Sequence, residues 1–344
     1  MAYDNTTAAM SEITRTLAAQ NWTDYGIQTL SLWFYGTGTN LPGQLYVKIN
    51  GVQVNYDGEA SNLTVAAWRP WNIDLTSVGA NLSSVTSLAI GIEGPGATGI
   101  LLLDDIRLYP YPRELITPVE PDPANLVGYW PLDGNYQDAS GNNRHGTPMG
   151  GPLFVPGAVG QALELDGVDD YVNIDGYKGI TADQTDPNNP VQQPFSIANW
   201  FRITETSGDH EMVTWGTQAG QQRVTWRVHE GRLRTEHASG NLRGNTYVND
   251  GEWHHGALVV TEGANLRVPA TRLFVDGVQD TVFSGSDAPY NLTAGADVRI
   301  GMSGPQDGRY FPGALDEVRI YDSVLTEEEI AWLAGRTLPF DKPF

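Results

Sequence analysis

Short runs in which apolar and polar residues alternate recur along the whole chain. Alternation with a period of two is typical of β-strands that bury one face, and glycine, asparagine and aspartate separate the runs as turn residues do. The clearest predicted strands are Thr29–Tyr35, Gln44–Ile49, Trp71–Leu75, Ser87–Ile92, Ile100–Tyr109, Ala162–Leu165, Tyr171–Ile174, Phe195–Ile203, Arg223–Val228, Gly256–Val260, Leu273–Val275 and Val298–Ile300. Many short strands pack most economically as two sheets face to face, so the pattern predicts an all-β protein built of β-sandwiches.

A proline-rich stretch divides the chain into two halves. The stretch Tyr109–Pro123 contains five prolines. Proline donates no amide hydrogen to a sheet, and a run of prolines favours an extended spacer. We therefore predict two β-sandwich (jelly-roll) domains, over residues 1–113 and 126–344, joined by a linker over residues 114–125.

The two halves end in similar strands. Asp104-Asp-Ile-Arg-Leu-Tyr109 and Asp316-Glu-Val-Arg-Ile-Tyr321 each begin with an acidic pair and follow a run that contains glycine. After the second copy, Glu327–Ala334 is predicted to be helical, because Thr326 and Glu329 have the spacing of a capping box. The sequence thus predicts one short helix at the end of the second sandwich.

Charge and composition narrow the possible partners. The 344 residues include 41 acidic and 20 basic side chains, which gives a net charge of −21. Nucleic acids and anionic membrane surfaces are bound by basic surfaces, so this balance argues against both. No apolar run approaches the ~18 residues that a membrane-spanning helix needs, and the chain has no cysteine, which excludes disulfides and thiolate metal sites.

Ordered sequence blocks in the second half carry a family resemblance. They are Gly128–Asp133, Asp138–Asn142, Ala162–Val172, Phe195–Trp200, Gly251–His255, Leu273–Gly277 and Gly313–Tyr321. From Leu126 to Gly335 the chain resembles the laminin-G-like, concanavalin A-like lectin/glucanase domains of secreted bacterial proteins. Residues 1–113 resemble the later part of a carbohydrate-binding-module jelly roll. The resemblance implies an extracellular or secreted location, a binding role, and other domains in a larger parent protein.

An oxygen-rich loop is the first candidate site. Its candidate ligands lie within ten residues of one glycine-containing loop: Asp133, Asn135, Asp138, Ser140 and Asn142. Ca2+ takes six to eight oxygen ligands and tolerates irregular loops. The resemblance implies that Asp316 closes this site around a structural ion. The alternative is that these side chains only hydrogen-bond the backbone in turns. By internal similarity, Asp104 and Asp105 form a second, weaker candidate metal site.

Arginine and aromatic residues are the candidate ligand-binding groups. In Arg223–His229, alternation places Arg223, Arg227 and His229 on one face of a strand and Trp226 on the other, and Arg234 continues the polar face after a turn. Arginine binds carboxylates and sulfates in a bidentate manner, so this face would take an acidic glycan. The alternative is a salt-bridged outer sheet face. In the first half, Trp68 and Trp71 are candidate sugar-stacking platforms, although burial in a sandwich core explains them equally well.

One carboxylate pair is a candidate for catalysis. Glu164 and Asp166 alternate on a predicted strand, so they share a face at a spacing of roughly 6.5–7 Å, close to the separations that glycosidases use. Gly167 interrupts this strand, however, and turn-capping is the alternative role. His254 and His255 are adjacent on another strand and must point to opposite faces, so they cannot chelate one ion together.

The preferred interpretation is a non-catalytic carbohydrate-binding or adhesion segment of a larger secreted bacterial protein, stabilised by Ca2+, with a polysaccharide, neutral or acidic, as its partner. A glycoside hydrolase or polysaccharide lyase of concanavalin A-like fold is the alternative, and a structural or protein-interaction module is the second alternative. The binding role is preferred because no carboxylate arrangement in the sequence forms a complete catalytic set.

Overall fold

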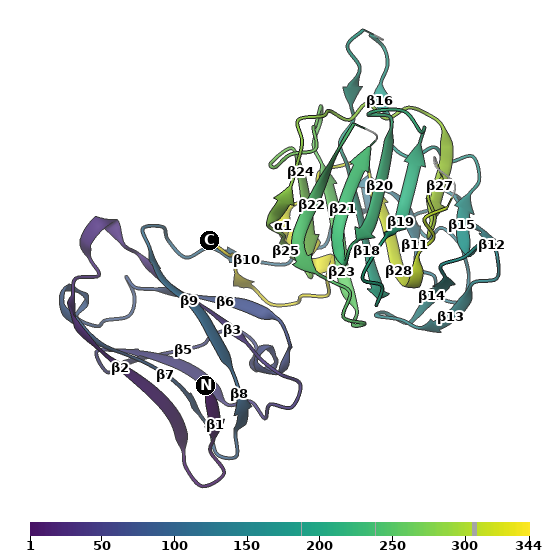
Figure 1. Cartoon of the computed structure of the whole chain (residues 1–344). Helices are drawn as coiled ribbons and strands as arrows, with labels where there is room; N and C mark the ends of the chain where they lie inside the picture. Colours follow the sequence, from purple (N-terminus) through teal and green to yellow (C-terminus); the bar gives the residue numbers. More distant parts are fainter. Residues whose placement is uncertain (187, 238, 305–307) are drawn as a thin grey trace. The chain divides into compact units, whose positions relative to one another are not determined.

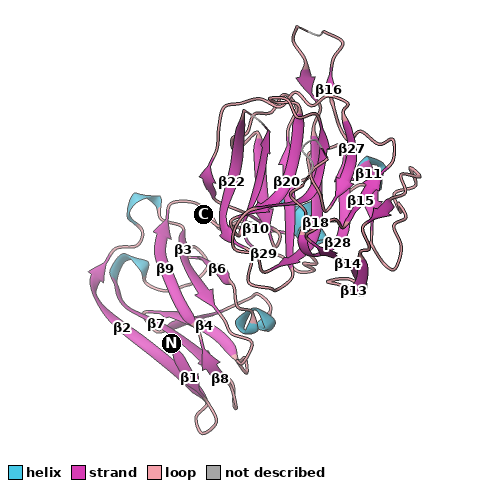
Figure 2. Cartoon of the chain, turned by 45° about the vertical axis from the view of Figure 1, so that its right-hand side comes forward, coloured by secondary structure: helices cyan, strands magenta, loops and turns pink. Residues whose placement is uncertain are grey.

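The computed structural model describes residues 1–186, 188–237, 239–304 and 308–344. The described part consists mainly of strands joined by turns, with short helical segments between them (Figures 1 and 2). It confirms the predicted all-β fold and the short C-terminal helix, which is α1 (Glu327–Leu333). Within the described ranges, no helix has the length and apolar character needed to cross a membrane.

Two compact units divide the chain. The first consists of Met1–Thr117 together with Leu338–Phe344, and the second of Pro118–Thr337. The division falls within the predicted linker, but the end of the chain returns to the first unit, whereas the sequence analysis assigned it to the second. A two-stranded pairing of β10 (Leu115–Ile116) with β29 (Phe340–Asp341) makes this return possible.

The first unit is a sandwich of a four-stranded and a three-stranded sheet. The larger has the order β2-β7-β4-β5 and the smaller the order β6-β3-β9, while β1 pairs with β8. Its elements are β1 (Ala2–Asp4), β2 (Met10–Gln20), η1 (Asp24–Gly26), β3 (Thr29–Tyr35), β4 (Gln44–Ile49), β5 (Val52–Asn55), η2 (Ala60–Thr64), β6 (Trp68–Asp74), η3 (Leu82–Ser84), β7 (Val85–Glu93), β8 (Thr98–Ile100) and β9 (Leu102–Tyr109). Residues such as Leu32, Phe34, Val47 and Trp71 fill the core between the sheets.

The second unit is a larger sandwich of two eight-stranded sheets. Its elements are η4 (Pro123–Asn125), β11 (Leu126–Trp130), β12 (Thr147–Met149), β13 (Leu153–Pro156), β14 (Gln161–Asp166), β15 (Tyr171–Ile174), β16 (Ala182–Asp183), β17 (Val191–Gln192), β18 (Phe195–Ile203), β19 (Asp209–Gly216), β20 (Arg223–His229), β21 (Arg232–His237), β22 (Gly240–Tyr247), β23 (His254–Val260), β24 (Thr271–Val275), β25 (Val278–Gln279), β26 (Val282–Ser284), β27 (Ala296–Ile300) and β28 (Pro312–Tyr321).

The two sheets of the second unit have different outer surfaces. One, here called the β28 sheet, has the order β13-β14-β28-β18-β23-β24-β25, with β11 also paired to β28. The other, here called the β20 sheet, has the order β12-β15-β27-β19-β20-β21-β22-β26. Large side chains including Trp215, Trp226 and Phe201 fill the space between them. A second apolar cluster includes Ile330 and Leu333 of α1 and residues of the β28 sheet, so the helix covers part of that sheet. The outer face of the β20 sheet carries polar side chains such as Arg223, Thr225 and Arg227.

The internal similarity predicted from the sequence extends to a shared β-bulge. Strands β9 and β28 each place two residues opposite one on their neighbours, β3 and β18. The bulged residues are Asp105 and Glu317, which adopt left-handed φ values of 48° and 54°. Each forms an ion pair with the arginine two residues later, Arg107 or Arg319. The two acidic pairs therefore have a common structural role at the bulge.

Candidate functional site

Asp133 and Asp316 lie near each other beside the turn that joins β13 to β14. The Oδ1 atom of Asp133 accepts the amide hydrogen of Gln161, and Oδ2 of Asp316 accepts that of Val159. Gly157 and Gly160 complete this turn, and a Cβ on either glycine would collide with the Asp316 or the Asp133 carboxylate. The two carboxylates thus converge on a turn that leaves room for them.

Asp316 has an unsatisfied oxygen. The residue is fully buried, and its Oδ1 atom has no hydrogen-bond partner. Burial, helped by the negative charges of Glu317 and Asp133, raises the pKa of Asp316 to about 7 against the opposing amide hydrogen bonds. A buried, unpaired carboxylate oxygen beside a second carboxylate is the arrangement that a hard cation would satisfy. These two residues fit the Ca2+ site that the family resemblance implies.

The other predicted ligands have roles in turns. Asp138 accepts three backbone amide hydrogens, from Tyr129, Ser140 and Arg144. Burial alone would raise the pKa of Asp138, but these hydrogen bonds outweigh it and the pKa is lowered. Asn135 accepts from the amide of Gln137. Their oxygens are engaged by the backbone, as the turn alternative predicted.

Ser140 is engaged in the same way. Its hydroxyl oxygen accepts hydrogen bonds from the amide and the side chain of Asn142. In the first unit, the carboxylate of Asp104 accepts the amide hydrogen of Asp105, and Asp105 pairs with Arg107 at 2.6 Å. Both acids are exposed on β9. The second, weaker metal site is therefore a bulge whose acidic side chains already have partners.

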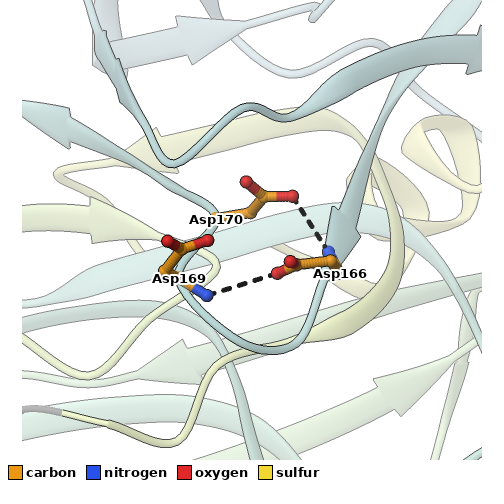
Figure 3. A group of neighbouring side chains, drawn as sticks. All are labelled: Asp166, Asp169 and Asp170. Carbon is orange, nitrogen blue, oxygen red and sulfur yellow. Dashed lines mark hydrogen bonds between the residues drawn. The ribbon is translucent and has the colours of Figure 1, made fainter.

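A further acidic group lies at the end of β14. Asp166, Asp169 and Asp170 bring carboxylate oxygens within 4.8 Å of one another (Figure 3). Their hydrogen bonds are those of a turn: Asp166 accepts amide hydrogens from Val168 and Asp169, and Asp170 accepts that of Asp166. These amides lower the pKa of Asp166. The turn geometry explains the group without a ligand.

The candidate catalytic pair does not form a site. Asp166 caps the turn just described, and Glu164 lies 3.5 Å from Arg202 in a partly exposed ion pair. Another pair of acids alternates on β19: burial raises the pKa of Glu211, whereas Arg227 and Arg309 overcome burial and lower that of Asp209. Opposed pKa shifts resemble those of a glycosidase pair, but Glu211 is 0% exposed and out of reach of a substrate.

The arginine-rich face of β20 is closed by ion pairs rather than open. Trp226 points into the core as predicted, with 0% exposure, but Arg227 on the opposite face is only 1% exposed. Its guanidinium lies 2.6 Å from Glu236, 3.1 Å from Glu211 and 3.2 Å from Asp209. The prediction that Arg227 is available to a ligand is therefore wrong, and the salt-bridged alternative holds at this position.

The other predicted groups on this face belong to the same network. Arg223 is 5% exposed and pairs with Glu236. Arg234 also pairs with Glu236, and His229 lies 2.6 Å from Asp209. Burial and the charge of Arg234 lower the pKa of His229 despite this carboxylate. His229 and Arg234 keep 20% and 16% of their side chains exposed, so only these two reach the surface appreciably.

An open hollow of about 450 Å³ adjoins the network. It is lined by Asp166, Gly167, Glu205, Gly208, Asp209, His210, Arg309, Tyr310 and Pro312. Its lining contains three carboxylates and one guanidinium, that of Arg309, which pairs with Asp209. Because carboxylates outnumber the guanidinium, the hollow is better suited to polar neutral or cationic groups than to an acidic sugar.

The tryptophans of the first unit separate into one exposed and one buried residue. Trp71 is 1% exposed in the core, which makes it wrong as a stacking platform. Trp68 is 43% exposed and lies directly opposite Tyr35 on β3, with ring centroids 5.5 Å apart. Trp33 lies two positions along the same face of β3 and is partly exposed. The outer face of the β6-β3-β9 sheet thus presents an aromatic platform.

The sequence analysis missed an aromatic pair at the β22–β26 end of the β20 sheet. Tyr247 of β22 and Phe283 of β26 are 63% and 58% exposed. The guanidinium of Arg232 lies 4.2 Å from the ring centroid of Tyr247 and 4.8 Å from that of Phe283. Exposed aromatic rings beside a cation were not recognisable in the sequence, because Phe283 lies some fifty residues from Arg232 in a three-residue strand.

The family of the second unit follows from this fold and from a family comparison. Residues 167–331 match the family model described as the concanavalin A-like lectin/glucanases superfamily. This confirms the resemblance predicted for the second half of the chain, which is a concanavalin A-like lectin/glucanase-type domain. A search of curated proteins finds no match.

Several solved structures are similar at low sequence identity. Domain 4 of an extracellular arabinanase from Geobacillus stearothermophilus, solved with arabinotriose, has a TM-score of 0.47 at 19% identity, covering 61% of this chain and 98% of that one. The binding domain of Paraclostridial Mosquitocidal Protein 1 has a TM-score of 0.46 at 16% identity, covering 62% and 52%. The carbohydrate-binding module of a Ruminococcus gnavus sialidase has a TM-score of 0.34 at 15% identity, covering 42% and 83%.

Proposed function

We propose that the chain is a non-catalytic carbohydrate-binding segment of a secreted, extracellular bacterial protein, and that Ca2+ stabilises its second unit. The observation that carries the proposal is the exposed aromatic platform of Trp68 and Tyr35 on the outer face of the β6-β3-β9 sheet. Flat aromatic faces bind the C–H faces of sugar rings, and a sheet face accommodates an extended polymer.

The second unit supports the same role through its family. Its fold is one used by lectins and glucanases, and its β20 sheet presents polar and aromatic side chains to solvent. Catalysis is less well supported, because Asp166 caps a turn, Glu164 pairs with Arg202 and Glu211 is inaccessible. The accessible side chains therefore favour binding of a carbohydrate without its cleavage.

The Ca2+ part of the proposal rests on the unsatisfied Oδ1 atom of Asp316 and its neighbour Asp133. A cation held there would join the turn between β13 and β14 to the long strand β28. It would also neutralise a buried negative charge that otherwise destabilises the fold. The ion would be structural and would not contact the sugar.

Sugar binding is tested with a panel of neutral and acidic polysaccharides in affinity gel electrophoresis. We expect Trp68→Ala to weaken retardation by a neutral polysaccharide at least about tenfold, as loss of a stacking platform does. Trp332→Ala is the matched control, because Trp332 is 38% exposed and belongs to α1 of the second unit, whereas the platform belongs to the first. Release of reducing sugar or of unsaturated products on incubation would instead favour the hydrolase or lyase. If no polysaccharide in the panel is retained, the binding function is wrong.

Ca2+ binding is tested by thermal unfolding in calcium and in chelator. We expect calcium at a hundred times its Kd to stabilise the second unit by about 2.7 kcal/mol, and Asp316→Asn to abolish this difference. Asp169→Asn is the control, because Asp169 belongs to the acidic turn of Figure 3 and not to the Asp316 site. A calcium-dependent shift of the unfolding temperature that survives Asp316→Asn but is lost in Asp169→Asn would place the ion at the acidic turn. That result would contradict the proposed site at Asp316.

A further inference from the structure

Arg232 differs from its neighbours on the polar face of the β20 sheet in lacking a carboxylate partner. Arg223, Arg227 and Arg234 all pair with Glu236, and Arg243 lies 2.9 Å from Glu230. Among the residues that the structure describes, no acid forms an ion pair with Arg232, and its Nε atom is buried without a hydrogen bond. Its two terminal nitrogens also have no partner there, and they are not buried. The positive charge of Arg232 is therefore uncompensated.

The fold holds this charge between two aromatic rings. Arg232 and Tyr247 are directly paired across β21 and β22, which fixes the guanidinium over the Tyr247 ring. Phe283 approaches from β26, which pairs with β22 and lies at the edge of the sheet. The guanidinium is thus positioned by cation–π contacts with both rings, while Tyr247 and Phe283 each stay more than half exposed.

A partly exposed cation beside exposed aromatic side chains matches a specific ligand chemistry. The planar guanidinium can donate two parallel hydrogen bonds to a carboxylate or sulfate, and the rings can pack against the C–H face of a pyranose. A neutral sugar would leave the charge of Arg232 unused, and a simple anion would leave the rings exposed. Because the chain carries a net charge of −21, anions without a built site are repelled.

We propose that Arg232, Tyr247 and Phe283 form a binding site for an anionic sugar unit, one that carries a carboxylate or a sulfate on its ring. This deepens the proposed function and rests on it, since the ligand is taken to be a glycan. It also relocates the acidic-glycan site from the centre of the β20 sheet, where the arginines are neutralised, to its β22–β26 end.

The test measures binding of the full chain to four probes by isothermal titration calorimetry. They are oligogalacturonate, neutral oligogalactan, dextran sulfate, and poly-glutamate as a carboxylate polymer without sugar rings. We expect oligogalacturonate or dextran sulfate to bind, and the stronger of the two identifies the anionic group. Arg232→Gln and Tyr247→Ala should each weaken that binding about tenfold or more.

Matched variants separate the site from general charge and from misfolding. Arg267→Gln is the charge control, because Arg267 is exposed and pairs with Asp287, and Tyr25→Ala is the aromatic control, with 93% exposure. Both should bind as the unaltered chain does. Arg232→Lys keeps the charge and loses the planar fork, so it should restore only part of the affinity. Unchanged unfolding temperatures show that the variants remain folded.

The outcomes distinguish this inference from the proposed function. If neutral polysaccharides bind through Trp68 but neither anionic glycan binds, the anionic site is wrong and the carbohydrate-binding function stands. Equal binding of poly-glutamate and oligogalacturonate would also overturn the site, because the rings would then contribute nothing. If no probe and no polysaccharide binds at all, both proposals fail together.

Discussion

Individual charges decide how the polar face of the second unit behaves. Arg227 is almost fully buried and contacts three acids. Burial alone would lower its pKa, but Glu211, Glu236 and Asp209 outweigh burial and raise it. Burial likewise raises the pKa of Glu211, whose Oε2 atom has no partner. The ion pairs therefore serve mainly to keep buried charges compensated, and the stability of the face depends on keeping them in balance.

Removing one charge of this network should lower the free energy of unfolding more than removing two opposite charges together. We expect Arg227→Met to lower the free energy of unfolding of the second unit by about 3–5 kcal/mol, since Glu211 loses its nearest cation. The double variant with Glu211→Leu should recover most of that loss. Urea unfolding of the full chain measures both. Arg107→Met, in an exposed pair, should leave the unfolding midpoint unchanged, and a double variant no more stable than Arg227→Met would contradict this account.

The pKa values of two adjacent histidines should be shifted in opposite directions. His254 lies 3.0 Å from Asp276 and 3.1 Å from Asp250, and these acids overcome burial and raise its pKa to about 9. Burial lowers the pKa of His255, which packs against Trp200, to about 3. One ring is thus inside and the other nearer the surface, as their adjacency on a strand predicted.

The consequence for stability follows from the sign of each shift. The folded pKa of His254 exceeds its unfolded value, so its contribution is complete below about pH 6.5 and is lost as the pH rises through 9. His254→Gln should remove the loss of stability between pH 7 and pH 10. His255 acts in the opposite range, because it must stay neutral as the pH falls toward 3. An NMR titration that places His254 near pH 6.5 would contradict the predicted pairing.

At the scale of elements, alternation located many of the strands that bury one face, although β19 and β21 were not among those predicted. The bounds predicted for β3, β4, β15 and β18 match the structure, because their inward residues repeat every second position. Strand β2 was missed, since most of its eleven residues are exposed and its sequence therefore lacks the alternating signal. The capping box fixed the start of α1, where Thr326 and Glu329 exchange the expected hydrogen bonds.

The closed arginine face could not be predicted by the same reasoning. Alternation correctly put Arg223 and Arg227 opposite Trp226, but it gives only direction, not accessibility. Accessibility depends on Asp209 and Glu211 of β19, Glu236 of β21 and the distant Arg309. These ion pairs connect residues on different strands, and which strands are neighbours depends on the order of strands in the sheet rather than on the local sequence. The turn roles of Asp138 and Ser140 were available as an alternative because they depend on local sequence alone.

At the scale of the whole chain, the last residues belong to the first unit through one buried acid. Asp341 is 5% exposed and accepts hydrogen bonds from Arg113, at 2.5 and 3.1 Å, and from the backbone amide of Asn72 on β6. Burial raises its pKa despite these partners. Arg113 also pairs with Asp57 at 2.7 Å. The unit that begins at Met1 is thus completed by residues that follow the whole second unit in the sequence.

Loss of this acid should destabilise one unit and leave the other unchanged. In Asp341→Ala the amide of Asn72 and part of the Arg113 guanidinium lose their acceptor in a buried position, which should cost about 3 kcal/mol. Hydrogen–deuterium exchange read peptide by peptide should show faster exchange in β3 and β6 and no change in β18 or β20. Glu114→Ala is the control, because Glu114 is exposed and lies 3.9 Å from Lys342. Faster exchange in β20 as well would mean that the two units do not unfold independently, and an unchanged β6 would mean that the C-terminal segment is not needed by the first unit.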